Sequence, residues 1–268
     1  MLKVEAIIIN TYVISDIHGC YDDFISMLEQ IDFSENDQLI LAGDYIDRGN
    51  KNFEMLKWIE NAPYNVLLVK GNHDVEFAQC INILSSFVGQ LNIKVSTTEE
   101  LLKVYLLIKE EFNNDMFDYY GTIKQLIVEH NVTLLDLNNW KKMIDIMPYY
   151  FKITINGQKH IITHAGYIAN EDFNMIETQY EDIESFYIYA RDDSIKHGGQ
   201  KDTTIIFGHT PTIMQGRFYN EGDVYKCTDY KSNCIFYNID CGKVYYSEKY
   251  KDAKLSCIRL EDKKIYYN

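Results

Sequence analysis

The stretch Gly43-Asp44-Tyr45-Ile46-Asp47-Arg48-Gly49 decides the fold of this chain. It directly follows an apolar run, Leu39 to Ala42, which has the length and composition of a buried strand. Two carboxylates and one guanidinium therefore emerge together at the carboxyl end of a strand, where open α/β sheets bind their ligands. Because unpaired charges beside a buried strand are costly to desolvate, a metal ion or a phosphate group is expected here.

Two further motifs have the same placement. Asp16-Ile17-His18-Gly19 follows a short apolar strand at 12–14, and Gly71-Asn72-His73-Asp74 follows another at 66–69. Asp16 and Asp44 are 28 residues apart, and so are Asp44 and Asn72. Each interval is long enough for one strand, one helix and the connection that leads into the next strand. Consecutive β-α-β units would then bring all three loops to one edge of a parallel sheet.

Later strands repeat the pattern with histidine. His164-Ala165-Gly166 comes after a predicted strand at 160–163, and Gly208-His209-Thr210 comes after one at 204–207. Arg191 follows an aromatic run, Phe186 to Ala190, that is predicted as a strand. The tail is predicted to form β-hairpins that close a second sheet against the first, with strands at 234–239, 243–246 and 255–260.

We expect one domain covering residues 1–268, with a helical insertion at about 80–147. Leu101, Val104, Tyr105 and Ile108 form one apolar stripe at helical spacing in this insertion. The insertion is either a cover over the site or simple packing, and the pattern alone leaves both interpretations open.

Composition limits the possible partners. The chain has 26 Lys and Arg against 40 Asp and Glu, a net charge of −14, which argues against a role in coating nucleic acids or binding anionic membranes. The apolar run Ala6 to Ile9 is too short for a signal peptide, and no segment has the length of a membrane span. We therefore expect a cytoplasmic monomer with reduced cysteines, since none of the six forms a C-x-x-C pair.

The five motifs, in this order, resemble the PPP-type serine/threonine phosphatases of the calcineurin-like metallophosphoesterase superfamily. The segment Asn238-Ile239-Asp240-Cys241-Gly242 resembles the bacterial and phage branch in particular. The resemblance implies an α/β fold, namely a β-sandwich of two mixed sheets flanked by helices, with a dinuclear metal centre. It covers roughly residues 11–245, and the helical stretch has no matching motif.

The resemblance also implies roles for individual residues. The metal ligands would be Asp16, His18, Asp44, Asn72, His164 and His209. His73 would be the general acid, oriented by Asp47, and Arg48 and Arg191 would bind the phosphate, with Asn72 nearby. Two divalent cations at such a site can acidify a shared water for direct attack on phosphorus. Manganese is the expected metal, although mixed carboxylate, amide and imidazole ligands also suit iron and zinc.

Three functions remain open at this stage. The first is hydrolysis of phosphate monoesters, with phosphoserine, phosphothreonine or phosphotyrosine in a phosphoprotein or phosphopeptide, or a small phosphoester, as substrate. The alternative is a dinucleoside polyphosphate hydrolase, and the third is an inactive metal-binding interaction module. Asp74 resembles the symmetrical dinucleoside tetraphosphatases, whereas Asp47 resembles the protein phosphatases, so these two residues point in opposite directions.

Overall fold

The structure is a computed structural model that describes residues 10–111, 117–176 and 179–268; the run Ala6 to Ile9 lies outside these ranges. The first half of the chain contains β1 (Thr11–Ile14), α1 (Tyr21–Gln30), β2 (Gln38–Leu41), α2 (Asn52–Glu60), β3 (Val66–Leu68), α3 (Asn72–Gln90), α4 (Thr98–Glu111), α5 (Thr122–His130) and α6 (Leu134–Asp145). The second half contains β4 (Tyr150–Ile155), β5 (Gln158–Thr163), α7 (Asn170–Phe173), α8 (Ile183–Tyr189), α9 (Asp193–Lys196), β6 (Thr203–Phe207), β7 (Tyr225–Asp229), β8 (Cys234–Asn238), the 3-10 helix η1 (Lys243–Tyr245), β9 (Ser256–Arg259) and β10 (Ile265–Tyr267).

The strands form two mixed sheets. The first has the order β10-β9-β1-β2-β3, in which β1, β2 and β3 run parallel. In the same sheet β9 pairs antiparallel with β1, and β10 pairs antiparallel with β9. The second has the order β4-β5-β6-β8-β7, in which β5, β6 and β8 run parallel. In the first sheet Ile14 lies opposite Leu41, and Leu41 lies opposite Leu68, so the three strands end level with one another.

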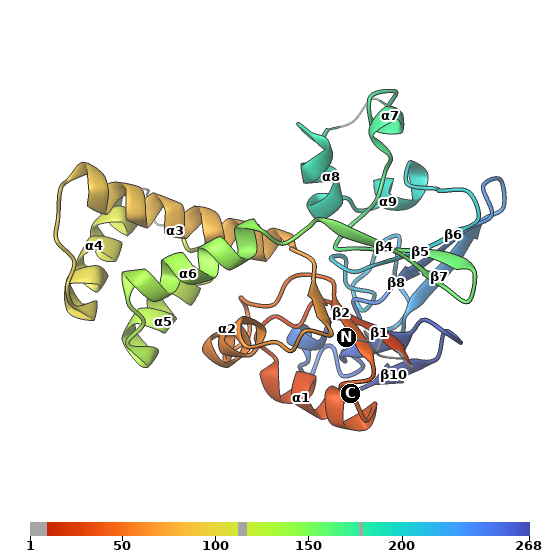
Figure 1. The fold of residues 1–268 in the computed structure, drawn as a ribbon, viewed down its shortest axis with the longest axis horizontal. Coiled ribbons are helices and arrows are strands. Elements are labelled where there is room, and N and C mark those ends of the chain that lie inside the picture. Colours follow the sequence, from red (N-terminus) through yellow and green to blue (C-terminus); the bar gives the residue numbers. More distant parts are fainter. Residues whose placement is uncertain (1–9, 112–116, 177–178) are drawn as a thin grey trace, which may run out of the picture.

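The two sheets pack face to face and carry helices on their outer faces. Apolar side chains from both sheets meet in one central cluster, for example Val13, Ile40, Ile162 and Ile206, all of which are fully buried. In Figure 1, α1 and α2 lie against the first sheet, whereas α7, α8 and α9 lie beside the second. The predicted fold, an α/β sandwich of two mixed sheets flanked by helices, is therefore confirmed.

Four helices, α3 to α6, occupy the chain between β3 and β4 and project away from the sandwich in Figure 1. The predicted stripe on α4, which includes Leu101 and Ile108, is buried in the same cluster as Trp140 of α6. At the base of these helices the Lys70 N–H donates a hydrogen bond to the Pro148 carbonyl at 3.1 Å. The two chain ends of the helical segment therefore lie side by side.

Three details of the second half differ from the sequence prediction. The run Phe186 to Ala190 lies mainly in helix α8, because the Asp182 side chain accepts a hydrogen bond from the Ser185 N–H at 2.7 Å and caps a helix there. Residues 243–245 form η1 instead of a strand, since Gly242 adopts a left-handed turn at φ +77°. The tail was expected to close the second sheet, but its strands are divided: β8 joins the second sheet, and β9 and β10 join the first.

Within the described part of the chain, no helix combines the length and apolar character needed to cross a bilayer. All six cysteines lie in described residues, and none of them forms a disulfide.

Candidate active site

The polar motifs of the sequence meet at one edge of the sandwich. Each candidate ligand lies within four residues of the carboxyl end of its strand. These residues are Asp16 and His18 after β1, Asp44 after β2, Asn72 after β3, His164 after β5 and His209 after β6. Because parallel strands end at the same edge of a sheet, the fold brings together side chains that are far apart in sequence.

The loops that carry these residues have unusual backbone conformations. Six non-glycine residues of the site have positive φ, a region that costs about 1–3 kcal/mol each and that clusters at functional sites. They are Asp16 (52°), His18 (47°), Asp44 (56°), Asp47 (72°), Arg48 (70°) and His209 (68°). Hydrogen bonds between loops hold them in place, such as His18 N–H to the Asp44 carbonyl at 2.9 Å and Asp16 N–H to the Gly43 carbonyl at 3.1 Å.

Two histidines have their tautomers set by backbone carbonyls. His18 Nδ1 lies 2.9 Å from the Ile46 oxygen, and His164 Nδ1 lies 2.9 Å from the Ala42 oxygen. A carbonyl can only accept, so each Nδ1 carries a proton and each Nε2 faces the site. Burial, reinforced by neighbouring imidazoles, lowers the pKa of His18 and of His209 well below the usual histidine value, so these rings are neutral.

Asn72, His164 and His209 place three ligand atoms in mutual contact. Asn72 Oδ1 lies 3.1 Å from His164 Nε2 and 3.0 Å from His209 Nδ1, and the two ring nitrogens are 3.2 Å apart. An amide oxygen and imidazole nitrogens are common metal ligands, so this cluster offers three donor atoms to one cation.

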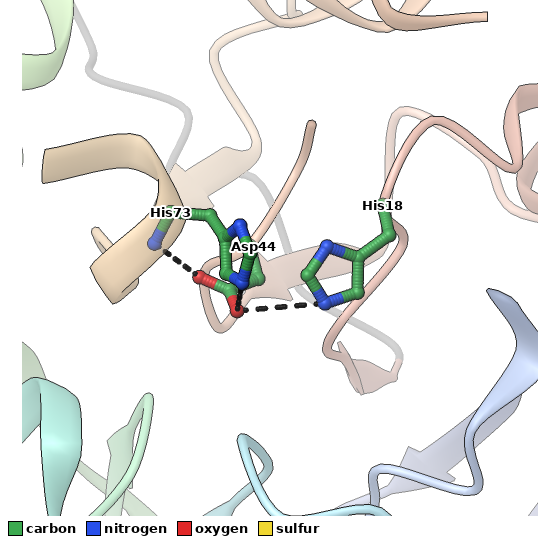
Figure 2. A group of neighbouring side chains, drawn as sticks. All are labelled: His18, Asp44 and His73. Atoms are coloured by element: carbon green, nitrogen blue, oxygen red, sulfur yellow. Dashed lines mark hydrogen bonds and ion pairs between the residues drawn. The ribbon is translucent and has the colours of Figure 1, made fainter. Parts of the chain in front are cut away.

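Asp44 stands between this group and a second one. Its Oδ2 lies 3.4 Å from His164 Nε2, 3.5 Å from His18 Nε2 and 3.9 Å from His73 Nε2. Figure 2 shows the carboxylate of Asp44 directed between the rings of His18 and His73, with its other oxygen accepting the His73 backbone N–H at 3.0 Å. The donor atoms of His18, Asp44 and His73, and likewise those of Asp44, His164 and His209, lie within 4.8 Å of one another. By donor type and spacing Asp44, His164 and His209 fit a divalent cation, and in the other group His18 and Asp44 offer two donors beside His73, which is held by Asp47.

Asp16 does not belong to either group. Its two carboxylate oxygens accept the His209 backbone N–H at 3.1 and 3.0 Å, and the Ser15 hydroxyl also contacts one of them. The Asp16 carboxylate therefore joins the loop after β1 to the loop after β6. Its predicted role as a metal ligand stays a proposal.

His73 is coupled to Asp47, as the sequence predicts for a general acid. His73 Nδ1 lies 2.8 Å from Asp47 Oδ2, and Nε2 faces Arg48 Nη2 at 3.1 Å. Burial by itself would lower the pKa of His73, but the charge of Asp44 and the hydrogen bond to Asp47 outweigh burial and raise it. A guanidinium can only donate, so Nε2 accepts from Arg48 in the structure, and a proton that His73 gives to the site would be carried on this same nitrogen.

Arg48 and Arg191 line the same cleft, a cavity of about 320 Å³. Arg191 donates a hydrogen bond to Thr210 Oγ1 at 3.5 Å, and Arg48 lies against the rings of Tyr120 and Tyr245 at 5.4 and 5.2 Å. Among the described residues, no carboxylate forms an ion pair with either guanidinium. Both therefore keep donors for an anion, which suits a phosphate-binding role.

Two residues of the helical insertion that no sequence motif identified lie at this site. Thr122 donates a hydrogen bond to Asp47, and the ring of Tyr120 lies 4.9 Å from that of His73. Asp240 is a further buried carboxylate on the cleft wall, and burial together with the nearby Asp16 raises its pKa. Asp240 follows the apolar strand β8, so the pattern that identified Asp44 could also have identified Asp240.

Comparison with known proteins defines the family. The family model described as calcineurin-like phosphoesterase matches residues 9–239. The chain belongs to the calcineurin-like phosphoesterase family. It is 39% identical over 228 residues, 83% of its length, to the symmetrical bis(5'-nucleosyl)-tetraphosphatase of Buchnera aphidicola subsp. Baizongia pistaciae. It is also 40% identical over 80 residues, 30% of its length, to the protein of that name from Salmonella arizonae. The matches cover 62% and 26% of those two proteins.

Solved structures share the fold of this calcineurin-like phosphoesterase. One, provisionally named a diadenosine tetraphosphatase, has 16% identity and a TM-score of 0.53 over 100% of this chain and 95% of its own. Another, a protein serine/threonine phosphatase from Saccharomyces cerevisiae, has 13% identity and a TM-score of 0.55 over 98% of this chain and 79% of its own. At these identities the likeness concerns the fold alone.

The expectation that this phosphoesterase is a serine/threonine protein phosphatase is wrong. Its curated relatives are named as symmetrical tetraphosphatases, which is the function indicated by Asp74. Asp47 misled the prediction, because a carboxylate in contact with a histidine suits hydrolysis of phosphomonoesters and of phosphoanhydrides equally well. Asp74 accepts three backbone N–H groups, from Asp44, Tyr45 and Gly71 at 2.8 to 3.1 Å, and so fixes the loop that carries Asp44.

Proposed function

We propose that this protein hydrolyses dinucleoside tetraphosphates symmetrically, giving two nucleoside diphosphates. The similarity of 39% over 83% of the chain to a tetraphosphatase carries this proposal. Asp74 supports the same substrate class through its resemblance to those hydrolases. The two unpaired guanidiniums in the cleft suit a substrate whose phosphates carry several negative charges.

The residues proposed to hold two divalent cations are Asp16, His18, Asp44, Asn72, His164 and His209. The mutual contact of Asn72 Oδ1, His164 Nε2 and His209 Nδ1 supports a cation at that position, because an amide oxygen and two imidazole nitrogens converge there. When bound, divalent cations neutralise phosphate oxygens and acidify the attacking water. Manganese remains the proposed metal, with iron and zinc as alternatives, because the mixed donor set does not discriminate among them.

Arg48 and Arg191 would bind the phosphate chain. Their guanidiniums can each donate two hydrogen bonds to phosphate oxygens, which fixes the orientation of the chain as well as its position. Both side chains are exposed to the cleft. The phosphorus under attack is therefore held where its bridging oxygen can reach His73.

His73 would give its proton to the departing diphosphate. A water oxygen bonds to one of the two central phosphorus atoms, the bond from that phosphorus to the central bridging oxygen breaks, and the His73 proton ends on that oxygen. The proton released by the water passes to solvent, from which His73 is protonated again. Asp47 would keep the ring oriented and stabilise its charged form through the 2.8 Å contact with Nδ1. Thr122 and Asn52 would in turn fix Asp47, since the Asp47 backbone N–H donates to Asn52 Oδ1 at 2.9 Å.

The product pattern tests this function. The enzyme is incubated with diadenosine tetraphosphate and manganese, and the nucleotides are separated by chromatography. We expect ADP as the only nucleotide product, and a kcat/KM at least tenfold above that for a phosphoserine peptide. Formation of ATP and AMP, or faster turnover of the phosphopeptide, would contradict the proposal.

A further inference from the structure

A second cavity, of about 580 Å³, lies beside the active-site cleft. Its walls come from α3, including Phe77 and Ile83, and from residues 117–120, just before α5. Glu76 and Tyr120 line both the cavity and the cleft, so the two spaces are neighbours. The cavity has the size of a small-molecule site, for which about 300–1,000 Å³ is usual.

The charge of this side cavity excludes phosphate. Its described lining contains no Lys or Arg, and its charged members, Asp47, Glu76 and Asp118, are all acidic. A phosphate group would be repelled, whereas a neutral ligand with N–H and O–H donors would be accepted. The arginines of the adjoining cleft provide the opposite environment. The two spaces together therefore match a molecule that has a neutral end and a polyphosphate end.

Aromatic side chains form much of the side cavity. Phe117 is buried beneath it, whereas Tyr119 is 72% exposed and Tyr120 is 40% exposed. The rings of Tyr119 and Tyr120 meet edge to face at 4.9 Å; Tyr120 also contacts His73 and Arg48, whereas the more exposed Tyr119 keeps ring surface for stacking. Aromatic side chains bind nucleobases by stacking, whichever base is present.

We infer that the side cavity binds the base and ribose of one nucleoside of the dinucleoside substrate. The phosphates then pass Tyr120, whose hydroxyl accepts a hydrogen bond from Arg48 at 3.4 Å, into the cleft between Arg48 and Arg191. The base amino group and the ribose hydroxyls are neutral donors, which an acidic lining accepts more readily than phosphate oxygens. This inference rests on the proposed function, and it gives the inserted helices a part in substrate choice.

Two variants of the side cavity test the inference. Tyr119→Ala removes a stacking ring, and Ile83→Trp places a bulky side chain in the wall at a half-buried position. The matched controls are Tyr230→Ala and Ile146→Trp, at residues that are 92% and 84% exposed and do not line the cavity. For each variant, kcat/KM is measured on diadenosine tetraphosphate and on inorganic tetraphosphate, which has the same phosphate chain without nucleosides.

We expect each cavity variant to lose about tenfold or more in kcat/KM on diadenosine tetraphosphate, mainly through KM. Its kcat/KM on inorganic tetraphosphate should stay within about twofold of wild type, and the controls should change on neither substrate. Equal losses on both substrates would overturn the inference, because the residues would then act on the chemistry. Unchanged activity on diadenosine tetraphosphate would overturn it as well.

Binding of adenosine alone separates this inference from the proposed function. Saturation-transfer NMR should show adenosine bound to the wild-type protein and not to Ile83→Trp. That result supports the cavity even if the products of hydrolysis contradict the symmetrical reaction. A wild-type protein that does not bind adenosine, or an Ile83→Trp variant that binds it equally well, would overturn the cavity whatever the products are.

Discussion

Thr122 Oγ1 donates a hydrogen bond to Asp47 Oδ1 and so joins helix α5 to the loop after β2 across 75 positions of sequence. The other oxygen of Asp47 lies 2.8 Å from His73 Nδ1. The helical insertion therefore acts on the proposed general acid through a single carboxylate. This contact favours a role for the insertion in the site over simple packing.

Thr122→Val keeps the shape of the side chain and removes the donor. Hydrogen bonds to charged groups contribute about 1.5–3 kcal/mol, so we expect kcat on diadenosine tetraphosphate to fall about tenfold or more. Thr122→Ser, which retains the hydroxyl, should recover most of the activity. Equal activity in the valine and serine variants would mean that the contact does not orient Asp47.

The leaving group tests proton donation by His73. His73→Ala should slow hydrolysis of phenyl phosphate far more than that of p-nitrophenyl phosphate, whose phenolate leaves with little help. Asp47→Asn should show the same preference more weakly, and the double variant should be scarcely worse than His73→Ala. Equal losses on both esters would instead indicate that His73 positions the phosphate.

The protonation of His73 should depend on its acidic neighbours. Its pKa in the folded, metal-free protein lies above the usual 6.5, because Asp44 and Asp47 outweigh burial. Its charged form therefore stabilises the fold fully below pH 6.5, and this contribution is lost as the pH rises through the raised pKa. NMR titration should show a lower pKa for His73 in Asp47→Asn, and an unchanged value would contradict the assigned cause.

Asp44→Asn tests the proposed metal centre. The substitution keeps the side-chain volume and removes the charge that faces both ligand groups, so activity should fall by several orders of magnitude while the circular dichroism spectrum is retained. Manganese should raise the melting temperature of the wild type more than that of the variant. Turnover near the wild-type rate at saturating manganese would exclude a bridging role for Asp44.

Arg191→Ala tests the phosphate clamp. If the guanidinium binds the transferring phosphoryl group, KM should rise and kcat fall, with a combined loss of about 2–4 kcal/mol in transition-state stabilisation. Arg191→Lys should recover only part of this, because an ammonium group cannot donate two parallel hydrogen bonds. Unchanged kinetics would mean that the contact with Thr210 is the only function of Arg191.

The β-α-β spacing predicted that the loops of Asp16, Asp44 and Asn72 meet at one sheet edge, and the family resemblance implied the sandwich and the full set of six ligands. It could not predict Thr122 or Tyr120, whose positions depend on how the inserted helices pack and not on any local pattern. Phe186 to Ala190 was predicted as a strand because aromatic residues favour strands, and the Asp182 cap outweighed that preference. Tyr225–Asp229 pairs as β7 although its alternation is weak, because it forms a hairpin with β8.

The hydrogen bond between Lys70 and Pro148 has a consequence for how specificity can change in this lineage. The helical segment starts and ends at adjacent points, so it is attached to the sandwich at one place. Exchange of the helices beyond the first turn of α3, which carries Asn72, His73 and Asp74, for helices of different length would leave the strand ends and the site residues in place. Other aromatic residues could then line the side cavity, so the enzyme could accept different substrates while the residues that act on the phosphates stay the same.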